Sequence, residues 1–237
     1  MQTRVEIADF ENWRAVAEGA ARIMREGEVV ALPTETVYGL GAVAFDPEAV
    51  ARVFEAKDRP SFDPLIVHIA GIRDLGRVAV VPAEVEDIVR QLAKAFWPGP
   101  LTMVLPKHED VPDLVTSGLP TVAVRVSKHE VMRYLTRELG PIAAPSANRF
   151  GRISPTSAGA VLRELDGRIP LVVDGGACSD GLESTIIAVE PGEKRPILRL
   201  LRPGPVTREE LQKFGKVPKV RRVTDDRPEA PGGLESQ

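Results

Sequence analysis

Apolar residues recur at helical spacing in four parts of the chain. This spacing predicts helices over residues 11–26, 46–56 and 83–96, and a fourth that begins at Ser154-Pro155. Gly27 is placed to end the first helix in a left-handed cap. Asp46 followed by Pro47 is an N-cap with proline at the first helical position. Each predicted helix has one apolar stripe, so one face of each is expected to be buried.

Short β-rich runs bounded by proline or glycine lie between these helices. They predict strands over residues 28–32, 65–69, 101–105, 121–126, 142–144, 171–173, 185–189 and 197–201. Strands therefore outnumber helices, and the alternation of the two is too irregular for a doubly wound parallel sheet. The pattern predicts an α/β fold built on a twisted mixed sheet with flanking helices.

Composition restricts the kind of protein this can be. With 237 residues, 43% of them hydrophobic, the chain can bury a full core. The net charge of −3 gives no sign of a nucleic-acid coat or a membrane-surface protein. Cys178 is the only cysteine, which excludes an internal disulfide and a multi-thiolate zinc site. No signal-peptide core or membrane-length apolar run is present in the sequence, so we expect a cytoplasmic protein without a membrane partner.

The character of the sequence changes after about Phe214. Residues 215–237 have little apolar periodicity and carry a basic run followed by proline and glycine. The sequence therefore predicts a domain over residues 1–214 and a linker or lid-like tail over residues 215–237.

Familiar catalytic motifs do not occur in this sequence. There is no phosphate-binding loop of the Gly-x-x-x-x-Gly-Lys type, no His-Glu-x-x-His and no Gly-x-Ser-x-Gly. Residues 39–44 superficially fit a dinucleotide-binding fingerprint, but the next helix is predicted to start only at Asp46. We therefore interpret residues 39–44 as a turn.

Three polar segments carry the chemistry that remains. Hydroxyl groups of residues 34–38 follow a strand that Pro33 ends, Lys57 and Arg59 stand just past a helix, and Ser146 and Asn148 occupy a turn. Paired cations suit a polyanion, whereas short polar groups on turns can hold a phosphate or a base edge. Each segment alone could be an ordinary surface turn. Together they predict an open, concave nucleotide site.

Two strand residues add to this site. Arg125 shares a strand face with Thr121 and Ala123, opposite three valines, and an arginine on such a face requires an anion. A ligand carboxylate would serve as well as a protein carboxylate. His68 lies on the face of Ile66, opposite Leu65 and Val67. A lone histidine in such an apolar strand is more often a hydrogen-bonded core residue than a ligand.

The chain resembles the YrdC-like threonylcarbamoyl-AMP synthase family. The resemblance rests on motifs in the family's order across about residues 10–212: PTETVYGL (33–40), KDR (57–59), PLIVH (64–68), WPGPLT (97–102), VAVRV (122–126), APSAN (144–148), STI (184–186) and LRPG (201–204). It implies an enzyme, a nucleotidyltransferase that condenses L-threonine, bicarbonate or CO2, and ATP into threonylcarbamoyl-AMP and pyrophosphate for tRNA modification.

The resemblance also implies roles for individual residues. The threonine would be held by Thr34, Tyr38, His68, Arg125 and Ser184, with Arg125 on its carboxylate. The nucleotide would be held by Lys57, Arg59, Thr121, Ser146, Asn148 and Arg202, among which Lys57 and Arg59 are the catalytic candidates. No metal-binding side chains are expected, since Mg2+ would enter with ATP and be held mainly by phosphates.

Partners and alternatives follow from the same residues. A downstream tRNA-modifying transferase would take the product, tRNA itself is a candidate partner, and residues 218–237 could fold over the nucleotide as a lid. The alternative is a non-enzymatic protein that binds double-stranded RNA or tRNA through Lys57, Arg59 and the basic tail; its RNA affinity would fall steeply with salt, and it would consume no ATP. A carbamoyl-transfer domain of hydrogenase maturation is a second alternative, but such domains belong to longer chains with zinc fingers.

Overall fold

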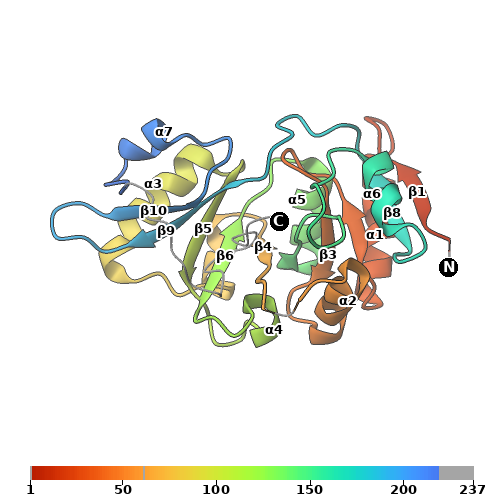
Figure 1. Ribbon diagram of the computed structural model, residues 1–237, viewed down its shortest axis with the longest axis horizontal. Helices are drawn as coiled ribbons and strands as arrows, with labels where there is room; N and C mark the ends of the chain where they lie inside the picture. Colours follow the sequence, from red (N-terminus) through yellow and green to blue (C-terminus); the bar gives the residue numbers. More distant parts are fainter. Residues whose placement is uncertain (1, 61, 219–237) are drawn as a thin grey trace.

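A computed structural model describes residues 2–60 and 62–218 of the chain. Within this part, ten strands form a single sheet: β1 (Arg4–Ile7), β2 (Val30–Leu32), β3 (Gly39–Val43), β4 (Ile66–His68), β5 (Leu101–Pro106), β6 (Thr121–Arg125), β7 (Ile142–Ala143), β8 (Leu171–Asp174), β9 (Thr185–Glu190) and β10 (Ile197–Arg202). Their spatial order is β1-β8-β2-β3-β7-β4-β6-β5-β9-β10, from one end of the molecule to the other (Figure 1).

The sheet is mixed, which confirms the predicted fold class. β8 lies parallel to both β1 and β2, β4 is parallel to β6, and β5 is parallel to β9. The other neighbours, including β3 with β7 and β9 with β10, are antiparallel. Seven of the eight predicted strands match β4 to β10 closely, and the eighth overlaps β2. Most of these strands are nearly continuous buried runs, whereas β10 is only partly buried.

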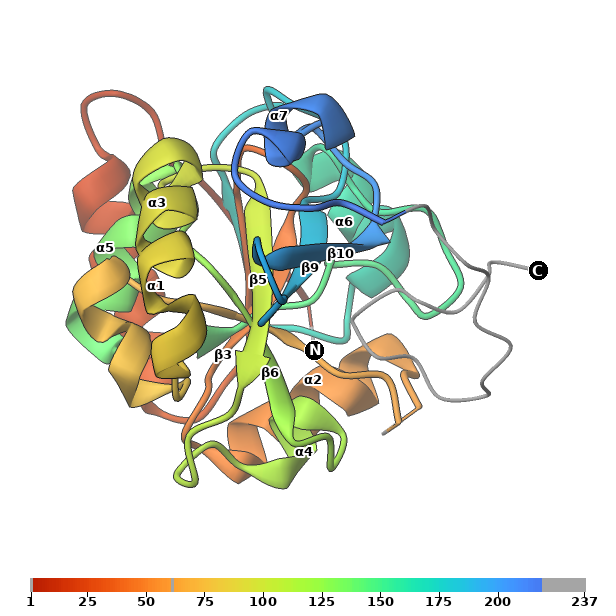
Figure 2. The same cartoon turned by 90° about the vertical axis from the view of Figure 1, so that its left-hand side faces the viewer.

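Helices flank this sheet. They are α1 (Trp13–Arg25), α2 (Pro47–Lys57), α3 (Glu86–Phe96), α4 (Asp113–Thr116), α5 (Glu130–Leu139), α6 (Ala158–Leu165) and α7 (Arg208–Gln212), with short 3₁₀ turns over Ile72–Arg77 and Ala83–Val85. Figure 2 shows α1, α3 and α5 together on one side of the twisted sheet and α6 on the other. The flanking arrangement predicted from the sequence is thus confirmed.

The predicted ends of the first two helices are confirmed by their caps. Gly27 has φ of +81°, and the Asp46 side chain accepts hydrogen bonds from the backbone N–H groups of Glu48 and Ala49. The predicted start at Ser154-Pro155 is wrong. Helix α6 begins at Ala158, where the Ser157 hydroxyl caps the backbone of Ala160.

The sequence did not predict β1, β3, α4, α5 and α7. Residues 39–43 were interpreted as a turn, but they form the buried strand β3, paired with β2 and β7. Helix α5 was missed entirely, although Val131, Met132 and Leu135 make its buried stripe against α1.

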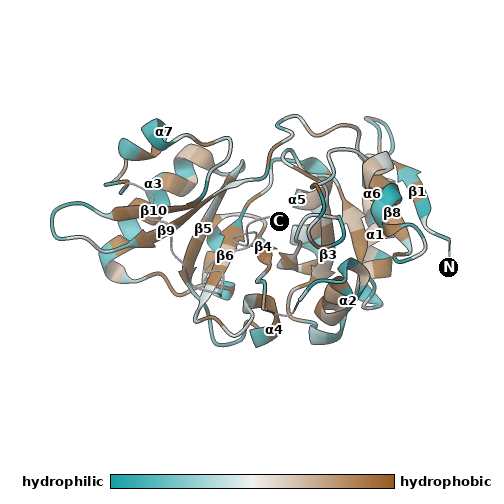
Figure 3. Ribbon diagram, in the orientation of Figure 1, coloured by the Kyte–Doolittle hydropathy of each residue, from teal (hydrophilic) through white to brown (hydrophobic). Residues whose placement is uncertain are grey.

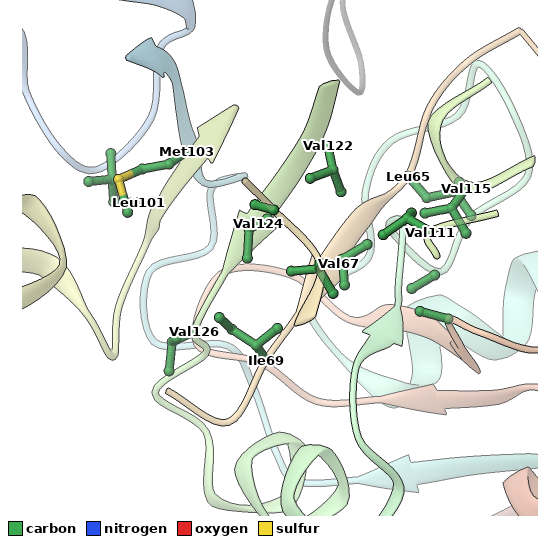
Figure 4. Close-up of a cluster of buried hydrophobic side chains, with 14 of the residues drawn as sticks. Leu65, Val67, Ile69, Leu101, Met103, Val111, Val115, Val122, Val124 and Val126 are labelled. Carbon is green, nitrogen blue, oxygen red and sulfur yellow. The ribbon is translucent and has the colours of Figure 1, made fainter. Parts of the chain in front are cut away.

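The two faces of the central strands differ in what they contact. Val67, Val122 and Val124 point into the main hydrophobic core, where they gather with Leu101 of β5 and other apolar side chains (Figure 4). Figure 3 shows the same concentration of hydrophobic residues along the central strands. The opposite face carries a smaller apolar cluster that includes Ile66 and Ala123, and His68 and Arg125 follow these two residues on the same face.

The domain extends slightly beyond its predicted end. Lys216 pairs with Ile197 beside β10, and Val217 is buried in the core, so the boundary predicted after residue 214 is too early. The rest of the predicted tail, residues 219–237, lies outside the described residues, and the lid remains a prediction. Over the described part of the chain, no helix has the length and hydrophobicity needed to cross a membrane.

Candidate functional site

A polar pocket opens on the face of β4 and β6 that points away from the main core. Its cavity volume is about 60 Å³. This central pocket is lined by Thr34, Thr36, Val37, Gly39, Arg59, Ile66, His68, Arg125, Ala144, Pro145, Ser146, Glu183, Ser184 and Arg202. Segments from six separate parts of the sequence therefore meet at the middle of the sheet.

The loop between β2 and β3 supplies one wall of the pocket. The Thr34 hydroxyl donates to the carbonyl oxygen of Val37 at 2.6 Å and accepts from the backbone N–H of Thr36 at 3.1 Å. The two threonine hydroxyls are 3.0 Å apart. The hydroxyls thus hold the turn that follows β2, and they do so at the surface of the pocket.

Arg125, at the end of β6, is the most buried cation of the pocket, with 3% of its surface exposed. Its Nη2 lies 2.6 Å from Oε1 of Glu35, in an ion pair that is not aligned as a hydrogen bond. Burial alone would raise the pKa of Glu35, but the charge of Arg125 and a hydrogen bond from Ser127 lower that pKa below its usual value. The anion that the sequence required for Arg125 is therefore present within the protein.

His68, at the end of β4, faces the pocket beside Arg125, as the strand alternation predicted. Burial, followed by the charge of Arg125, lowers the pKa of His68 to about 3, so its imidazole is neutral at pH 7. Among the described residues, its Nδ1 has no hydrogen-bond partner. Buried polar atoms are rarely left without one, which makes His68 a candidate to bind a ligand.

Two more guanidinium groups line the pocket, and each meets a carboxylate. Arg59 lies 2.8 Å from Oδ2 of Asp63 and donates to the carbonyl oxygen of Pro64 at 2.9 Å. Arg202 forms an ion pair with Glu183 and donates to the Ser184 hydroxyl at 3.0 Å. All three lining arginines are thus oriented by carboxylates of the protein itself.

Ser184 connects Arg202 of the pocket to strand β5. Its hydroxyl is 2.8 Å from that of Thr102 on β5. Glu183 accepts a hydrogen bond of 2.5 Å from Ser154. Burial would raise the pKa of Glu183, but the charge of Arg202 and this bond lower that pKa. Ser154 therefore orients a pocket carboxylate and does not start a helix.

Lys57 lies behind the pocket and does not line it. It is 1% exposed, and its ammonium donates hydrogen bonds to the carbonyl oxygens of Ser146 and Asn148. Burial, with the charge of Arg59 as the next cause, lowers the pKa of Lys57 to about 7. Its direct role at the phosphates is therefore not supported by its position; it anchors the loop that carries Ser146.

The structure brings most, but not all, of the predicted site residues together. Those that line the central pocket are Thr34, Arg59, His68, Arg125, Ser146, Ser184 and Arg202. Tyr38 does not line the central pocket, because its ring lies in the core and its hydroxyl donates to the Gly176 carbonyl oxygen at 2.7 Å. Thr121 lies four residues before Arg125, at the other end of β6, and it also falls outside the pocket lining.

Asn148 is likewise placed behind the pocket wall. Its amide donates to the carbonyl oxygens of Arg149 at 2.9 Å and Arg152 at 2.7 Å, which stabilises the loop after β7. Its Oδ1 has no hydrogen-bond partner in the described part of the chain. Asn148 therefore shapes this loop, and direct contact with a nucleotide stays a prediction.

Sequence reasoning missed the acidic residues of the site. Glu35, Asp63 and Glu183 were not assigned any role, although each pairs with a pocket arginine. For one of these pairs the sequence carried a signal, because Asp63 follows Arg59 by only four residues and the two opposite charges are close enough in sequence to pair. The other two pairs join distant segments and leave no pattern in the sequence.

Comparison with known proteins identifies the family. The model of the Sua5, YciO and YrdC family, described as "Telomere recombination", matches residues 22–204. This chain belongs to the Sua5/YciO/YrdC family. The family resemblance predicted from the sequence motifs is thereby confirmed.

Relatives within the Sua5/YciO/YrdC family have a consistent name. The threonylcarbamoyl-AMP synthase of Pyrococcus abyssi (strain GE5 / Orsay) is 49% identical over 228 residues, which cover 94% of this chain and 64% of that protein. The enzyme of the same name from Bacillus subtilis (strain 168) is 48% identical over 195 residues, 81% of this chain and 54% of that protein. The chain thus spans between about half and two thirds of the length of these relatives.

Solved structures of the Sua5/YciO/YrdC family also match the fold. A crystal structure of P. abyssi Sua5 complexed with L-threonine has a TM-score of 0.85 and 45% sequence identity, covering 99% of this chain and 68% of that one. The alternative of a non-enzymatic RNA-binding protein receives no support from these relatives.

Proposed function

We propose that this chain is a threonylcarbamoyl-AMP synthase, which condenses L-threonine, bicarbonate or CO2, and ATP into threonylcarbamoyl-AMP and pyrophosphate. The central observation is that Arg125, the neutral His68 and Ser184 meet in one pocket with Arg59 and Arg202. In this proposal, Arg125 would bind a carboxylate, and the neighbouring Arg59 and Arg202 would bind phosphates. The name shared by the curated relatives and the threonine complex of P. abyssi Sua5 support the same activity.

The pocket suggests how the threonine would be held. Arg125 would bind its carboxylate, and the unpartnered Nδ1 of His68 and the hydroxyls of Thr34 and Ser184 would bind its hydroxyl and amino groups. A hydrogen bond from a buried group to the threonine hydroxyl would favour threonine over amino acids whose side chain has no hydroxyl.

The chemical step would rely on position and charge. The neutral threonine amine adds to CO2 and loses a proton to solvent, which gives a carbamate. A carbamate oxygen then forms a bond to the α-phosphorus of ATP as the bond to the pyrophosphate leaving group breaks. Arg59, Arg202 and Ser146 would orient the phosphates during this displacement. Lys57 would act as a positioning residue through the loop of Ser146.

We propose that Mg2+ enters with ATP and neutralises part of the phosphate charge. Among the residues that the structure describes, no group of three or more His, Cys, Asp or Glu side chains is placed to hold a metal. Phosphates and water would therefore supply most of its ligands. The product would pass to a tRNA-modifying transferase, with tRNA as a further candidate partner.

A single assay tests the activity. The protein is incubated with ATP, Mg2+, bicarbonate and L-threonine, and pyrophosphate release is measured together with mass-spectrometric detection of threonylcarbamoyl-AMP. We expect release only when threonine and bicarbonate are both present. Release that does not depend on threonine, or no release by folded protein, would overturn the proposal.

A further inference from the structure

Arg125 and Glu35 form a wall between two hollows. Arg125 lines the central pocket, whereas Glu35 lines a second hollow, the side pocket, together with Lys128, His129 and Ser179. Thr34 lines both. The two residues of this ion pair therefore line different pockets, Arg125 the central pocket and Glu35 the side pocket.

The guanidinium has anchors other than Glu35. Its Nε donates to the carbonyl oxygen of Gly99 at 3.2 Å, and its Nη1 donates to the Thr36 hydroxyl at 2.7 Å. Glu35 is itself fixed, since the Ser127 hydroxyl donates to its Oε2 at 2.6 Å. Arg125 can therefore keep its direction toward the central pocket without the charge of Glu35.

We propose that Glu35 is an internal counter-ion that competes with the substrate carboxylate for Arg125 and so limits the affinity of the central pocket for the amino acid. This inference rests on the proposed function, in which Arg125 receives the threonine carboxylate. Both carboxylates would then share one guanidinium in a buried site, where screening by water is weak. Their mutual repulsion opposes binding, although Glu35 stabilises the protein before the ligand arrives.

A purely structural role for Glu35 predicts the opposite sign. If Glu35 served only to hold Arg125 in place, its loss would loosen the guanidinium and weaken threonine binding. If Glu35 is a counter-ion, the neutral variant Glu35→Gln is less stable without ligand, because a buried charge loses its partner. The ligand carboxylate then replaces that partner, and threonine binds more tightly.

Calorimetric titration of purified Glu35→Gln with two ligands separates these roles. L-threonine is compared with L-threoninol, in which an alcohol replaces the carboxylate. We expect threonine affinity to rise on the order of tenfold and threoninol affinity to stay within about twofold. The matched control is Glu86→Gln, which removes the carboxylate of an exposed pair with Arg90 and should change neither affinity.

Threonine binding that is unchanged or weaker in Glu35→Gln would overturn the proposal, as would an equal gain for threoninol. If that variant does not fold, Glu35→Asp withdraws the carboxylate from Arg125 by one methylene and is expected to show a smaller gain of the same sign. The outcome of the wild-type titration separates the two proposals. No threonine binding by wild type would overturn the proposed function as well, whereas normal wild-type binding without a gain overturns only the role of Glu35.

Discussion

The ammonium of Lys57 donates a hydrogen bond to the carbonyl oxygen of Ser146, which lies 89 positions later in the chain. A second bond goes to the carbonyl oxygen of Asn148. These bonds join the end of α2 to the loop after β7, and that loop carries a wall of the central pocket. Lys57, which the family resemblance assigns to the nucleotide, therefore contacts the backbone of another segment that lines the pocket.

Replacing Lys57 by alanine should weaken nucleotide binding. Without the ammonium, two carbonyl oxygens lose their donor, and the Ser146 loop is no longer fixed. We expect ATP affinity to fall at least about tenfold, with threonine affinity changed less than about threefold. Separate calorimetric titrations measure both. Lys94→Ala, at an exposed position on α3, is the control, and equal losses for the two ligands in Lys57→Ala would contradict the prediction.

The low pKa of Lys57 also predicts a pH dependence of stability. Burial lowers this pKa from 10.5 to about 7 in the folded protein, so between these values the unfolded chain binds a proton that the folded protein does not. The free energy of unfolding of wild type, relative to Lys57→Met, should therefore rise with pH across this window, by at most about 1.4 kcal/mol per pH unit. Urea unfolding of both proteins between pH about 6 and about 9 measures the difference. A flat or falling difference would be inconsistent with a buried lysine.

Arg125→Ala should have the reverse ligand profile of Lys57→Ala. It removes the guanidinium that would bind the threonine carboxylate and leaves Glu35 buried without its ion-pair partner. We expect threonine affinity to fall at least about a hundredfold and ATP affinity less than about fivefold. Thermal unfolding monitors folding, and Arg90→Ala on the surface of α3 is the matched control. Loss of ATP binding to the same extent would count against the assignment.

Leu101→Ala should reduce stability without changing ligand binding. Leu101, the first residue of β5, is fully buried in the main hydrophobic core (Figure 4) and does not line the central pocket. The cavity left by its side chain should cost about 2–5 kcal/mol in the free energy of unfolding. Ile153→Ala, at a side chain that is 93% exposed, should cost less than about 0.5 kcal/mol. Denaturant unfolding tests both, and similar losses would contradict the assigned core.

Gly204→Ala should disturb the pocket through backbone contact. A Cβ atom at this position would lie 2.5 Å from the carbonyl oxygen of Glu183 and 2.5 Å from the backbone nitrogen of Thr185, so the segment that carries Ser184 must shift. We expect a loss of about 1–3 kcal/mol in stability and weaker binding of both ligands. Gly76→Ala, whose Cβ would meet no atom within 4 Å, is the control. Wild-type binding in Gly204→Ala would show that this contact is dispensable.

The interior strands were easier to predict from the sequence than the start of α6 or the glycine-rich strand β3. The interior strands are largely continuous apolar runs, and such a run can be recognised from one segment of the sequence alone. Strand β3 was missed because its glycines resemble a turn. Gly41 leaves room for its neighbours, since a Cβ atom there would lie 2.8 Å from the Leu32 side chain and 3.3 Å from the Ile142 side chain, so that these side chains would have to move. Such a close approach between strands cannot be read from one segment.

The candidate site was predicted in part for the same physical reason. Alternation within each strand placed His68 on the face of Ile66 and Arg125 on the face of Ala123, and the register of β4 with β6 brings these two faces together. Burial could not be inferred for Lys57, because its enclosure depends on carbonyl groups of a distant loop. The partner of Arg125 is Glu35, and this pairing depends on a tertiary contact that no spacing encodes.

The pairing of β8 with strands on both sides has a consequence for biosynthesis. β8, which ends at Asp174, is inserted between β1 and β2, both of which leave the ribosome much earlier. Until β8 has been translated, the backbone N–H and C=O groups of β1 lack their strand partner and stay hydrogen-bonded to water. Completion of this edge of the molecule is therefore a late, long-range event, which leaves the nascent chain dependent on slow contacts between its beginning and a region near its last quarter.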